Sequence, residues 1–281
     1  MEAKSLAQRL QTIDRRLLYL FLAILMIAPL FYRKHFLPTY VSEEAKGVYN
    51  AVEAVPADKV IVLAADYDPG TMGENQPQLE AVMRHIMKLG KKFIILAQLP
   101  VGPELAEAAA DSLSKEFGRK YGEDWVNWGF LPGGLPMLEG LLRNFRTQVK
   151  KDIKGKPLDE LPLMAGVKDI HDVGLWLDFT GTGIWSGYVQ LIYGPYKVPV
   201  GVGCTAVVGP QLFPYLDSKQ LTGQLFGMRG AAEYEELNHH YGKGDQAMPS
   251  ISFAHFLIIF LIIVGNVGYF WSRRQTGAGR S

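Results

Sequence analysis

The sequence predicts an α/β domain with a mainly parallel sheet of about five strands, flanked by N- and C-terminal transmembrane helices. Three observations lead to this fold class. Two long apolar runs without Asp, Glu, Lys or Arg lie near the ends of the 281-residue chain. Between them, short apolar runs alternate with amphipathic ones, and basic and acidic residues nearly cancel.

The two apolar runs predict membrane spans at 17–37 and 251–271. Each is close to the roughly 20 residues that an α-helix needs to cross the hydrocarbon layer. Aromatic residues bound both runs, as is typical of membrane interfaces. No A-x-A-like cleavage site follows the first run, so we interpret it as an uncleaved signal-anchor.

Basic flanking residues predict the orientation of these spans. Residues 1–16 carry four Lys or Arg and residues 272–281 carry three, whereas the inner flanks carry fewer. The positive-inside rule places both termini in the cytoplasm. The domain at 38–250 is therefore expected outside a cell (inner) membrane, in the periplasm or at the cell exterior.

Residues 38–250 alternate strand and helix patterns. The expected strands are 59–66, 91–98, 125–130, 173–180 and 198–208, and the expected helices are 75–90, 102–122, 135–153, 183–194 and 217–237. Asn75 and Asp217 are expected to cap the first and last helices. This order implies right-handed βαβ crossovers and a Rossmann-like sheet with helices on both faces.

The composition argues against several functional classes. A net charge of +1 without a basic stripe gives no support to nucleic-acid binding. The single cysteine, Cys204, rules out an internal disulfide. The sequence contains no G-x-S-x-G, H-E-x-x-H or P-loop motif. We therefore expect no catalytic constellation and no cofactor, with a divalent cation as the one candidate.

Carboxylates gather where two predicted strands end. Asp66 ends the first strand, Asp68 and Glu74 follow it, and Asp178 and Thr180 end the fourth. Ligands of open parallel sheets bind beyond the carboxyl ends of the strands. Converging Asp66, Asp68 and Asp178 would suit Mg²⁺ or an acid/base pair with separated pKa values. The Asp-Pro-Gly sequence at 68–70 is also strong turn chemistry, and both interpretations stay open.

The loop GTGIWSG at 181–187 is a loosened form of a dinucleotide fingerprint. It follows a strand and opens a helix, but its spacing is G-x-G-x-x-x-G and no acidic residue lies about 20 positions on. We therefore interpret it mainly as a tight strand-to-helix turn, with nucleotide binding as the weaker alternative. An anion at that helix N-terminus is a further interpretation.

Small residues recur along the last predicted helix. Gly223, Gly227 and Ala231 are spaced by four and predict a smooth helix face. Glycine inside a helix costs about 1 kcal/mol relative to alanine, so something is expected to pack closely there, either the sheet or another subunit. Asn266 lies inside the second predicted span and is expected to bond another membrane helix.

Three segments carry a family resemblance. The runs DYDPGTMGEN, YGEDWVNWGFLPGG and FPYLDSKQLTGQLFGMRGAAEYE resemble an uncharacterised family of membrane-anchored prokaryotic proteins with an extracytoplasmic α/β domain. Lys219 stands where that family's pattern has glycine. The resemblance implies a bacterial or archaeal source and implies no activity.

Together these features predict a non-catalytic structural or scaffolding subunit of a membrane assembly, with homo- or hetero-oligomeric membrane partners. The alternative is a metal-dependent enzyme or small-ligand-binding module that uses the carboxylates at the sheet edge. Co-purification from native membranes separates the two.

Overall fold

The computed structural model describes residues 14–31 and 38–278. The chain divides into two units. Met1–Pro38 and Gln246–Ser281 form one, and Thr39–Asp245 forms the other.

The unit Thr39–Asp245 is built on one sheet of six parallel strands, which confirms the mainly parallel α/β class. The strands are β1 (Val60–Asp66), β2 (Phe93–Ala97), β3 (Trp125–Phe130), β4 (Val173–Thr180), β5 (Val200–Cys204) and β6 (Gly223–Phe226). Their order in the sheet is β3-β2-β1-β4-β5-β6. The chain therefore moves outward from β1 on one side and from β4 on the other. The β1–β4 junction is the topological switch point of this Rossmann-like sheet, where ligands of such folds bind.

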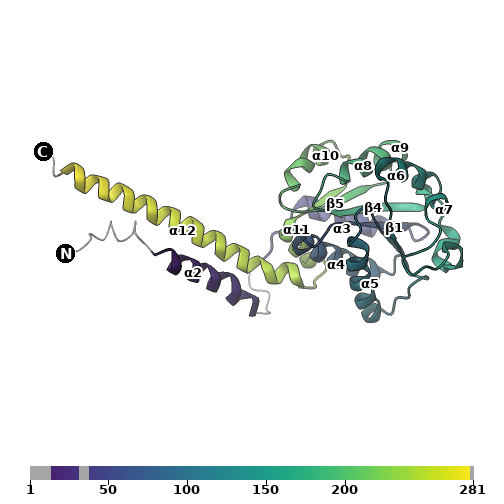
Figure 1. Cartoon of the computed structure of the whole chain (residues 1–281), viewed down its shortest axis with the longest axis horizontal. Coiled ribbons are helices and arrows are strands. Elements are labelled where there is room, and N and C mark those ends of the chain that lie inside the picture. The colour runs from purple at the N-terminus through teal and green to yellow at the C-terminus, as the bar shows by residue number, and fades with distance from the viewer. Residues whose placement is uncertain (1–13, 32–37, 279–281) are drawn as a thin grey trace. The chain divides into compact units, whose positions relative to one another are not determined.

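Helices cover both faces of the sheet (Figure 1). The α-helices of this unit are α3 (Glu43–Ala54), α4 (Met72–Leu89), α5 (Gly102–Phe117), α6 (Gly134–Arg143), α7 (Phe145–Gln148), α8 (Trp185–Tyr188), α9 (Gly194–Tyr196), α10 (Phe213–Asp217) and α11 (Gly227–Leu237). The 3₁₀ segments are η2 (Leu158–Glu160), η3 (Pro162–Gly166), η4 (Ile170–Asp172) and η6 (Gly209–Leu212), and η5 (Val189–Tyr193) is π-helical. One face is covered by α3, α4, α5 and α11, and the other mainly by α6, α7, α8 and η5.

The strand β1 is buried on both faces, as its continuous apolar sequence predicts. Ile61 and Leu63 join the core beneath α4 and α5, whereas Val62 and Ala64 join the core beneath α6 and α8. Because side chains alternate along a strand, Asp66 lies on the same face as Val62 and Ala64. The acidic end of β1 is thus directed toward the layer that contains α8.

The predicted helix at 217–237 is wrong over its first half. Asp217 ends α10 instead of capping a helix, and Lys219 has a left-handed φ of 58°. The next residues form β6, which pairs with β5 and supplies the sixth strand. A Cβ at Gly223 would lie 2.4 Å from the carbonyl oxygen of Glu44. Glycine is thus required by the close approach of β6 to α3.

Two other predicted helices are interrupted. The helix predicted at 135–153 ends at Arg143, because Asn144 is extended and its side chain caps α7. The helix predicted at 183–194 contains the π-helical turn η5 between α8 and α9. Such turns are frequent at functional sites.

The other unit contains α2 (Arg15–Ile27), η1 (Ala28–Phe31) and most of α12 (Lys243–Ala278). Among the described residues, one helix, Lys243–Trp271, is long and apolar enough to cross a membrane by length and composition. The span predicted at 251–271 lies inside it. The span predicted at 17–37 lies partly outside the described residues, and its described part lies in the 13-residue helix α2, which begins at Arg15, and in the 3₁₀ turn η1. Two flanking transmembrane helices are thus supported only at the C-terminal end.

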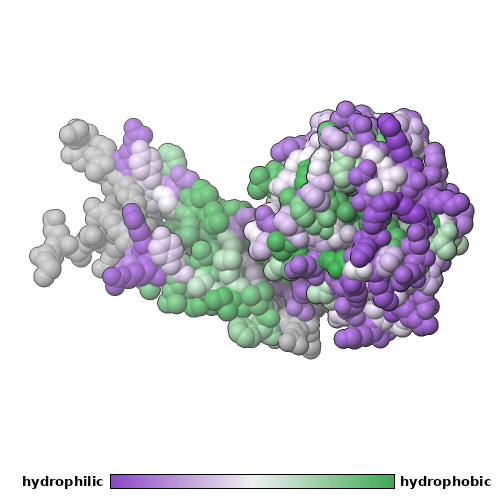
Figure 2. Space-filling model, turned by 45° about the vertical axis from the view of Figure 1, so that its right-hand side comes forward, coloured by the Kyte–Doolittle hydropathy of each residue, from purple (hydrophilic) through white to green (hydrophobic). Residues whose placement is uncertain are grey.

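The surfaces of the two units differ in polarity. Figure 2 shows mostly hydrophobic side chains on the described part of the helical unit, whereas the visible face of Thr39–Asp245 is mostly hydrophilic. The exposed apolar residues of α12 include Phe256, Ile259 and Phe260. Such a surface is typical of a helix that contacts a membrane or a protein partner.

Candidate functional site

The structure brings Asp66 and Asp178 together at the switch point. In the β1–β4 ladder Asp66 pairs with Thr180 and Ala64 with Asp178, so the two acids lie two residues apart in register on neighbouring strands. Both side chains are completely buried. They are close enough for a side-chain hydrogen bond and for direct charge interaction.

The carboxylate of Asp66 accepts two hydrogen bonds. The backbone N–H of Gln98, just after β2, donates to Oδ1 at 2.5 Å. The hydroxyl of Tyr188 on α8 donates to Oδ2 at 2.6 Å. These two donors favour the ionised form of Asp66.

Asp178 lacks such donors. Both of its oxygens are buried and receive no N–H or O–H from the described residues. An ionised Asp178 would leave two charged oxygens unsatisfied, at a cost of several kcal/mol. A protonated Asp178 can instead donate to the neighbouring Asp66, which satisfies both groups. Where Asp66 is ionised, this geometry favours a single proton in the pair, held by Asp178.

The pKa values follow from this geometry. Burial raises the pKa of Asp66 to about 6, although the hydrogen bonds from Tyr188 and Gln98 act in the opposite direction. Burial and the charge of Asp66 hold the pKa of Asp178 well above its usual range. Asp66 and Asp178 thus lie together with pKa values raised by burial, and their role as an acid/base pair stays a prediction.

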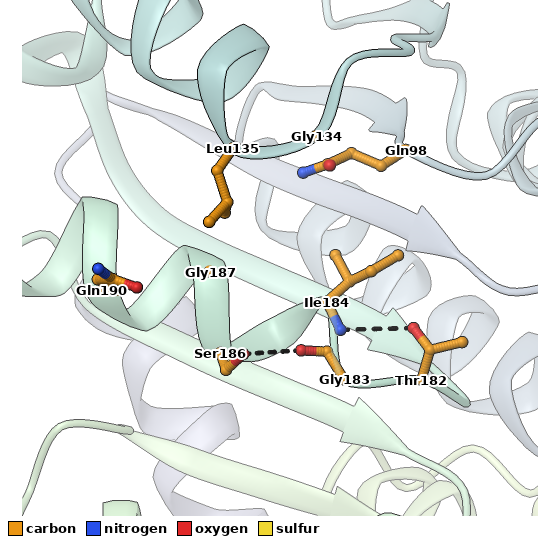
Figure 3. Close-up of a pocket in the computed structure, with 9 residues that line it drawn as sticks. All are labelled: Gln98, Gly134, Leu135, Thr182, Gly183, Ile184, Ser186, Gly187 and Gln190. Carbon is orange, nitrogen blue, oxygen red and sulfur yellow. Dashed lines mark hydrogen bonds between the residues drawn. The ribbon is translucent and has the colours of Figure 1, made fainter.

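A cavity of about 530 Å³ opens at the same edge of the sheet (Figure 3). Its lining comes from the loops that follow β2 and β4, the start of α6, α8 and η5. The lining residues are Gln98, Gly134, Leu135, Thr182, Gly183, Ile184, Ser186, Gly187 and Gln190. Four of them have uncharged polar side chains, three are glycines, two are apolar, and none carries a charge.

The GTGIWSG loop forms one wall of this cavity. The Ile184 N–H donates to Thr182 Oγ1 at 3.4 Å, and Ser186 Oγ donates to the Gly183 carbonyl at 2.8 Å, as Figure 3 shows. A Cβ at Gly187 would lie 2.6 Å from Leu135 Cδ2, so this glycine lets α6 and α8 approach each other. The loop is thus both a tight turn and a cavity wall, and the uncharged lining offers no side-chain cation to an anion.

The other predicted site residues, two acids and a threonine, have structural roles. Asp68 is exposed and accepts from the N–H groups of Gly70 and Thr71 at 2.8 and 3.2 Å, which forms the turn expected of Asp-Pro-Gly. Glu74 accepts from the Ala206 N–H at 2.9 Å and orders the loop after β5. Thr180 Oγ1 accepts from the Thr182 N–H at 3.0 Å. Among these groups only Asp66 and Asp178 converge.

Asn75 does not cap α4, which begins three residues earlier at Met72. Its buried amide instead donates to the carbonyl oxygens of Thr180 and Gly203, at 3.2 and 3.3 Å. Gln78, one turn on, donates to the carbonyl of Gly227 at 2.7 Å. These two amides from α4 fix the carboxyl ends of β4 and β5 and the start of α11 relative to one another.

The donor set does not suit a hard divalent cation. Mg²⁺ and Ca²⁺ take six or more oxygen ligands, and the third expected carboxylate, Asp68, turns back on its own loop. Within 14–31 and 38–278, three or more His, Cys, Asp or Glu side chains converge nowhere in a metal-binding arrangement. No step through a metal is therefore derived.

The sequence did not identify Gln98 and Tyr188, the two hydrogen-bond donors to Asp66, as site residues. Gln98 was recognisable only as the end of a strand. Tyr188 shares its segment with Tyr193 and Tyr196, and no local pattern distinguishes it. Only the packing of α8 over β1 and β4 shows that Tyr188 contacts Asp66.

The predicted small-residue face is not formed. Gly223 lies in β6, and Gly227, at φ 56°, begins α11. Gly223 and Ala231 are buried within Thr39–Asp245. These positions serve packing inside this unit. Asn266 lies exposed on α12.

Comparisons with known proteins add little to this picture. No family model matches the chain, and no curated protein matches it. A solved structure, the molybdenum cofactor binding protein from the phototrophic bacterium Rippkaea orientalis, aligns with 65% of this chain and 96% of its own. Its identity is 15% and its TM-score is 0.33. A likeness at this level carries no argument, so the family resemblance of the motifs remains a prediction.

Proposed function

We propose that the unit Thr39–Asp245 binds a small, uncharged polar molecule in the cavity at the β1–β4 switch point. The observation that carries this proposal is the lining, which combines uncharged hydrogen-bonding side chains with two apolar ones and has no charged group. The volume falls in the range of small-molecule sites, and the position is where open α/β sheets bind ligands.

The hydrogen-bonding groups of the cavity favour a ligand with hydroxyl or amide groups. Gln98 and Gln190 each supply an amide, and Thr182 and Ser186 supply hydroxyls. Burying a ligand's charge here would cost free energy that no side chain of the lining offsets. A neutral sugar, nucleoside or amide fits this chemistry better than its phosphorylated or carboxylated analogue.

The test compares matched probes with the full chain in detergent micelles by saturation-transfer NMR. The pairs are galactose and galacturonate, uridine and uridine monophosphate, and nicotinamide and nicotinate. Saturable binding is expected for at least one neutral member, and weaker binding for its charged partner. Binding by the charged members alone, or by no probe, contradicts the proposal.

A cavity-filling substitution locates the binding. A Cβ at Gly183 meets no atom within 4 Å, and its backbone φ is not left-handed, so Gly183→Leu fills the cavity without a clash at Cβ. Gly166→Leu is the matched control, because Gly166 is also unobstructed but does not line the cavity. The Gly183 variant is expected to lose probe binding and the Gly166 variant to keep it.

The proposed setting is a two-span membrane anchor, with both termini in the cytoplasm and the domain outside it. Support comes from the apolar length of α12, the apolar sequence of 17–32 and the basic residues beyond both. The scaffolding role predicted from the sequence retains one point of support, the exposed amide of Asn266 on α12. Native gels in mild detergent that show a monomer at all concentrations would count against that role.

A further inference from the structure

A chain of hydrogen bonds joins the cavity to the buried acids. Gln98 lines the cavity, and its side-chain Nε2 lies 3.3 Å from the hydroxyl of Tyr188 and donates to it. That hydroxyl donates to Asp66, which also accepts from the Gln98 backbone. Gln98 therefore contacts Asp66 directly through its backbone and indirectly through Tyr188.

The direction of this chain is set by the proton count of the acid pair. Tyr188 has one hydroxyl proton. While Asp66 is ionised, the Tyr188 hydroxyl donates its hydrogen bond to Asp66. The tyrosine oxygen therefore accepts from the Gln98 NH₂ group. The amide oxygen of Gln98 is then left to accept from a ligand, beside the second N–H of its NH₂ group, and the cavity presents a side-chain acceptor.

When Asp66 takes up a proton from solvent, the second of the pair, the direction of donation along this chain of hydrogen bonds is reversed. A protonated Asp66 can donate to the tyrosine oxygen, and the tyrosine hydroxyl then turns to donate to an acceptor. The Gln98 amide supplies that acceptor when its NH₂ and C=O groups exchange places. Its NH₂ group then faces the cavity, and no covalent bond other than O–H is made or broken.

We propose that Gln98 determines the hydrogen-bond polarity of the cavity: it presents an acceptor when Asp66 and Asp178 share one proton, and a donor when they hold two. This inference rests on the proposed ligand-binding role of the cavity and adds its specificity. Ligands with hydroxyl or N–H donors bind to the one-proton form, and ligands with carbonyl acceptors bind to the two-proton form.

The surroundings place this change in an accessible pH range. The buried thiol of Cys204 on β5 is also subject to the charges of Asp178 and of Glu74 on α4. Burial raises the pKa of Cys204 to about 12, so it stays a thiol. With the pKa of Asp66 raised to about 6 and that of Asp178 raised well above its usual range, the pair passes from two protons to one near pH 6.

The experiment follows the Gln98 side-chain amide in the full chain, labelled with ¹⁵N-glutamine, by NMR across pH 6. The Gln98 resonances are identified by their loss in Gln98→Asn. A titration with a midpoint near pH 6 is expected. In Tyr188→Phe the titration is expected to be lost, whereas the matched variant Tyr193→Phe, at a half-buried tyrosine outside the cavity lining, keeps it. A flat Gln98 resonance in the wild type, or an equal titration in Tyr188→Phe, overturns the proposal.

A pair of probes tests the specificity itself. Pyrrole is a hydrogen-bond donor only, and N,N-dimethylacetamide is an acceptor only. Pyrrole is expected to bind more tightly above pH 6 and dimethylacetamide below it, and pH-independent binding of both probes contradicts the inference. If neither probe binds at any pH, the proposed ligand-binding function fails. The NMR titration of Gln98 still tests separately whether its amide reorients with pH.

Discussion

At the scale of single residues, the buried acid pair makes the stability of the domain depend on pH. The folded pKa values of Asp66 and Asp178 are raised, so folding retains protons that the unfolded chain has lost. A raised carboxyl pKa contributes stability that is fully present below the unfolded value of 3.8 and is lost as pH rises through the folded value. For Asp66 this loss ends near pH 6, and the raised pKa of Asp178 adds a loss in the same direction.

Asp178→Asn is expected to stabilise the protein at and above neutral pH. The asparagine amide donates to Asp66 as the protonated acid does, without the need to retain a proton. The stability of the variant relative to wild type should rise by up to about 1.4 kcal/mol per pH unit above the usual carboxyl range. Thermal unfolding followed by tryptophan fluorescence across this range measures it.

Asp68→Asn is the control for this prediction. Its side-chain oxygen can accept the same two turn hydrogen bonds, and the site is exposed. The stability difference between this variant and wild type is expected to stay nearly constant with pH. If Asp178→Asn destabilises the protein equally at every pH, Asp178 is not a protonated donor in the folded state.

The sequence predicted part of this site, for identifiable reasons. Asp66 and Asp178 each end an apolar run, and the parallel sheet brings strand ends to one edge, so both were expected at that edge. Their convergence depended on β1 and β4 being neighbours, which the sequence did not show. Asp68 was expected at the same sheet edge, but its side chain accepts hydrogen bonds from the backbone of Gly70 and Thr71 in its own turn. Tyr188 and Gln98 could not be assigned, because their roles depend on strand order and on the packing of α8.

At the scale of elements, α11 holds both segments of the chain that lead away from the α/β domain. Glu233 accepts from the backbone N–H and hydroxyl of Ser42, which caps α3. Glu235 accepts three backbone N–H groups at the start of α12, from Gly242, Gly244 and Asp245, at 2.9, 2.9 and 2.7 Å. Two glutamates separated by one residue thus fix where the chain enters and leaves this unit.

Glu235→Gln is expected to destabilise the folded protein by about 2 kcal/mol. The glutamine keeps one acceptor oxygen and places an NH₂ group against a backbone N–H, and hydrogen bonds to charged groups are worth about 1.5–3 kcal/mol. Urea unfolding of the full chain measures the loss, and hydrogen exchange should accelerate at the amides of 242–245.

Glu43→Gln serves as the matched control, because Glu43 forms an exposed ion pair with Lys46. Such pairs contribute about 0–1 kcal/mol, so the change should be small. Equal effects of the two substitutions would show that Glu235 does not hold the start of α12.

The sequence predicted five of the six strands, because each of those is a continuous apolar run or follows a clear helix stop. It missed β6, which has four residues and lies between Lys219 and Gly227. Both have positive φ, which local patterns do not reveal. Because Asp217 resembles an N-cap and residues 227–237 are helical, the predicted helix was started at Asp217 and wrongly included β6.

At the scale of the whole molecule, the proposed topology places the cavity outside the cytoplasm. The single cysteine is buried, so a label can be introduced without competition. Ser112 is exposed on α5. In intact cells, Ser112→Cys in a Cys204→Ala background is expected to react with a membrane-impermeant maleimide, and the background alone is not. Labelling only after cell lysis would place the domain in the cytoplasm.

The order of strands and the anchor illustrate what sequence patterns leave undetermined. Alternating strands and helices predicted parallel pairing, but several orders satisfy right-handed crossovers. The order β3-β2-β1-β4-β5-β6 depends on which helices cover which face. The apolar run at 17–32 has the composition of a membrane span, but the α-helix that contains it, α2, is only 13 residues long and is followed by a 3₁₀ turn.

The central claim is that the cavity beside the Asp66–Asp178 pair binds a small uncharged ligand. Methyl NMR of the full chain with uridine, galactose or nicotinamide added tests it most directly. We expect saturable shifts of the Ile184 and Leu135 methyl groups, which line this cavity, and none at Ile153, which lines a separate cavity rich in charged residues. Shifts confined to Ile153, or unchanged Ile184 and Leu135 methyls with every probe, would contradict the claim.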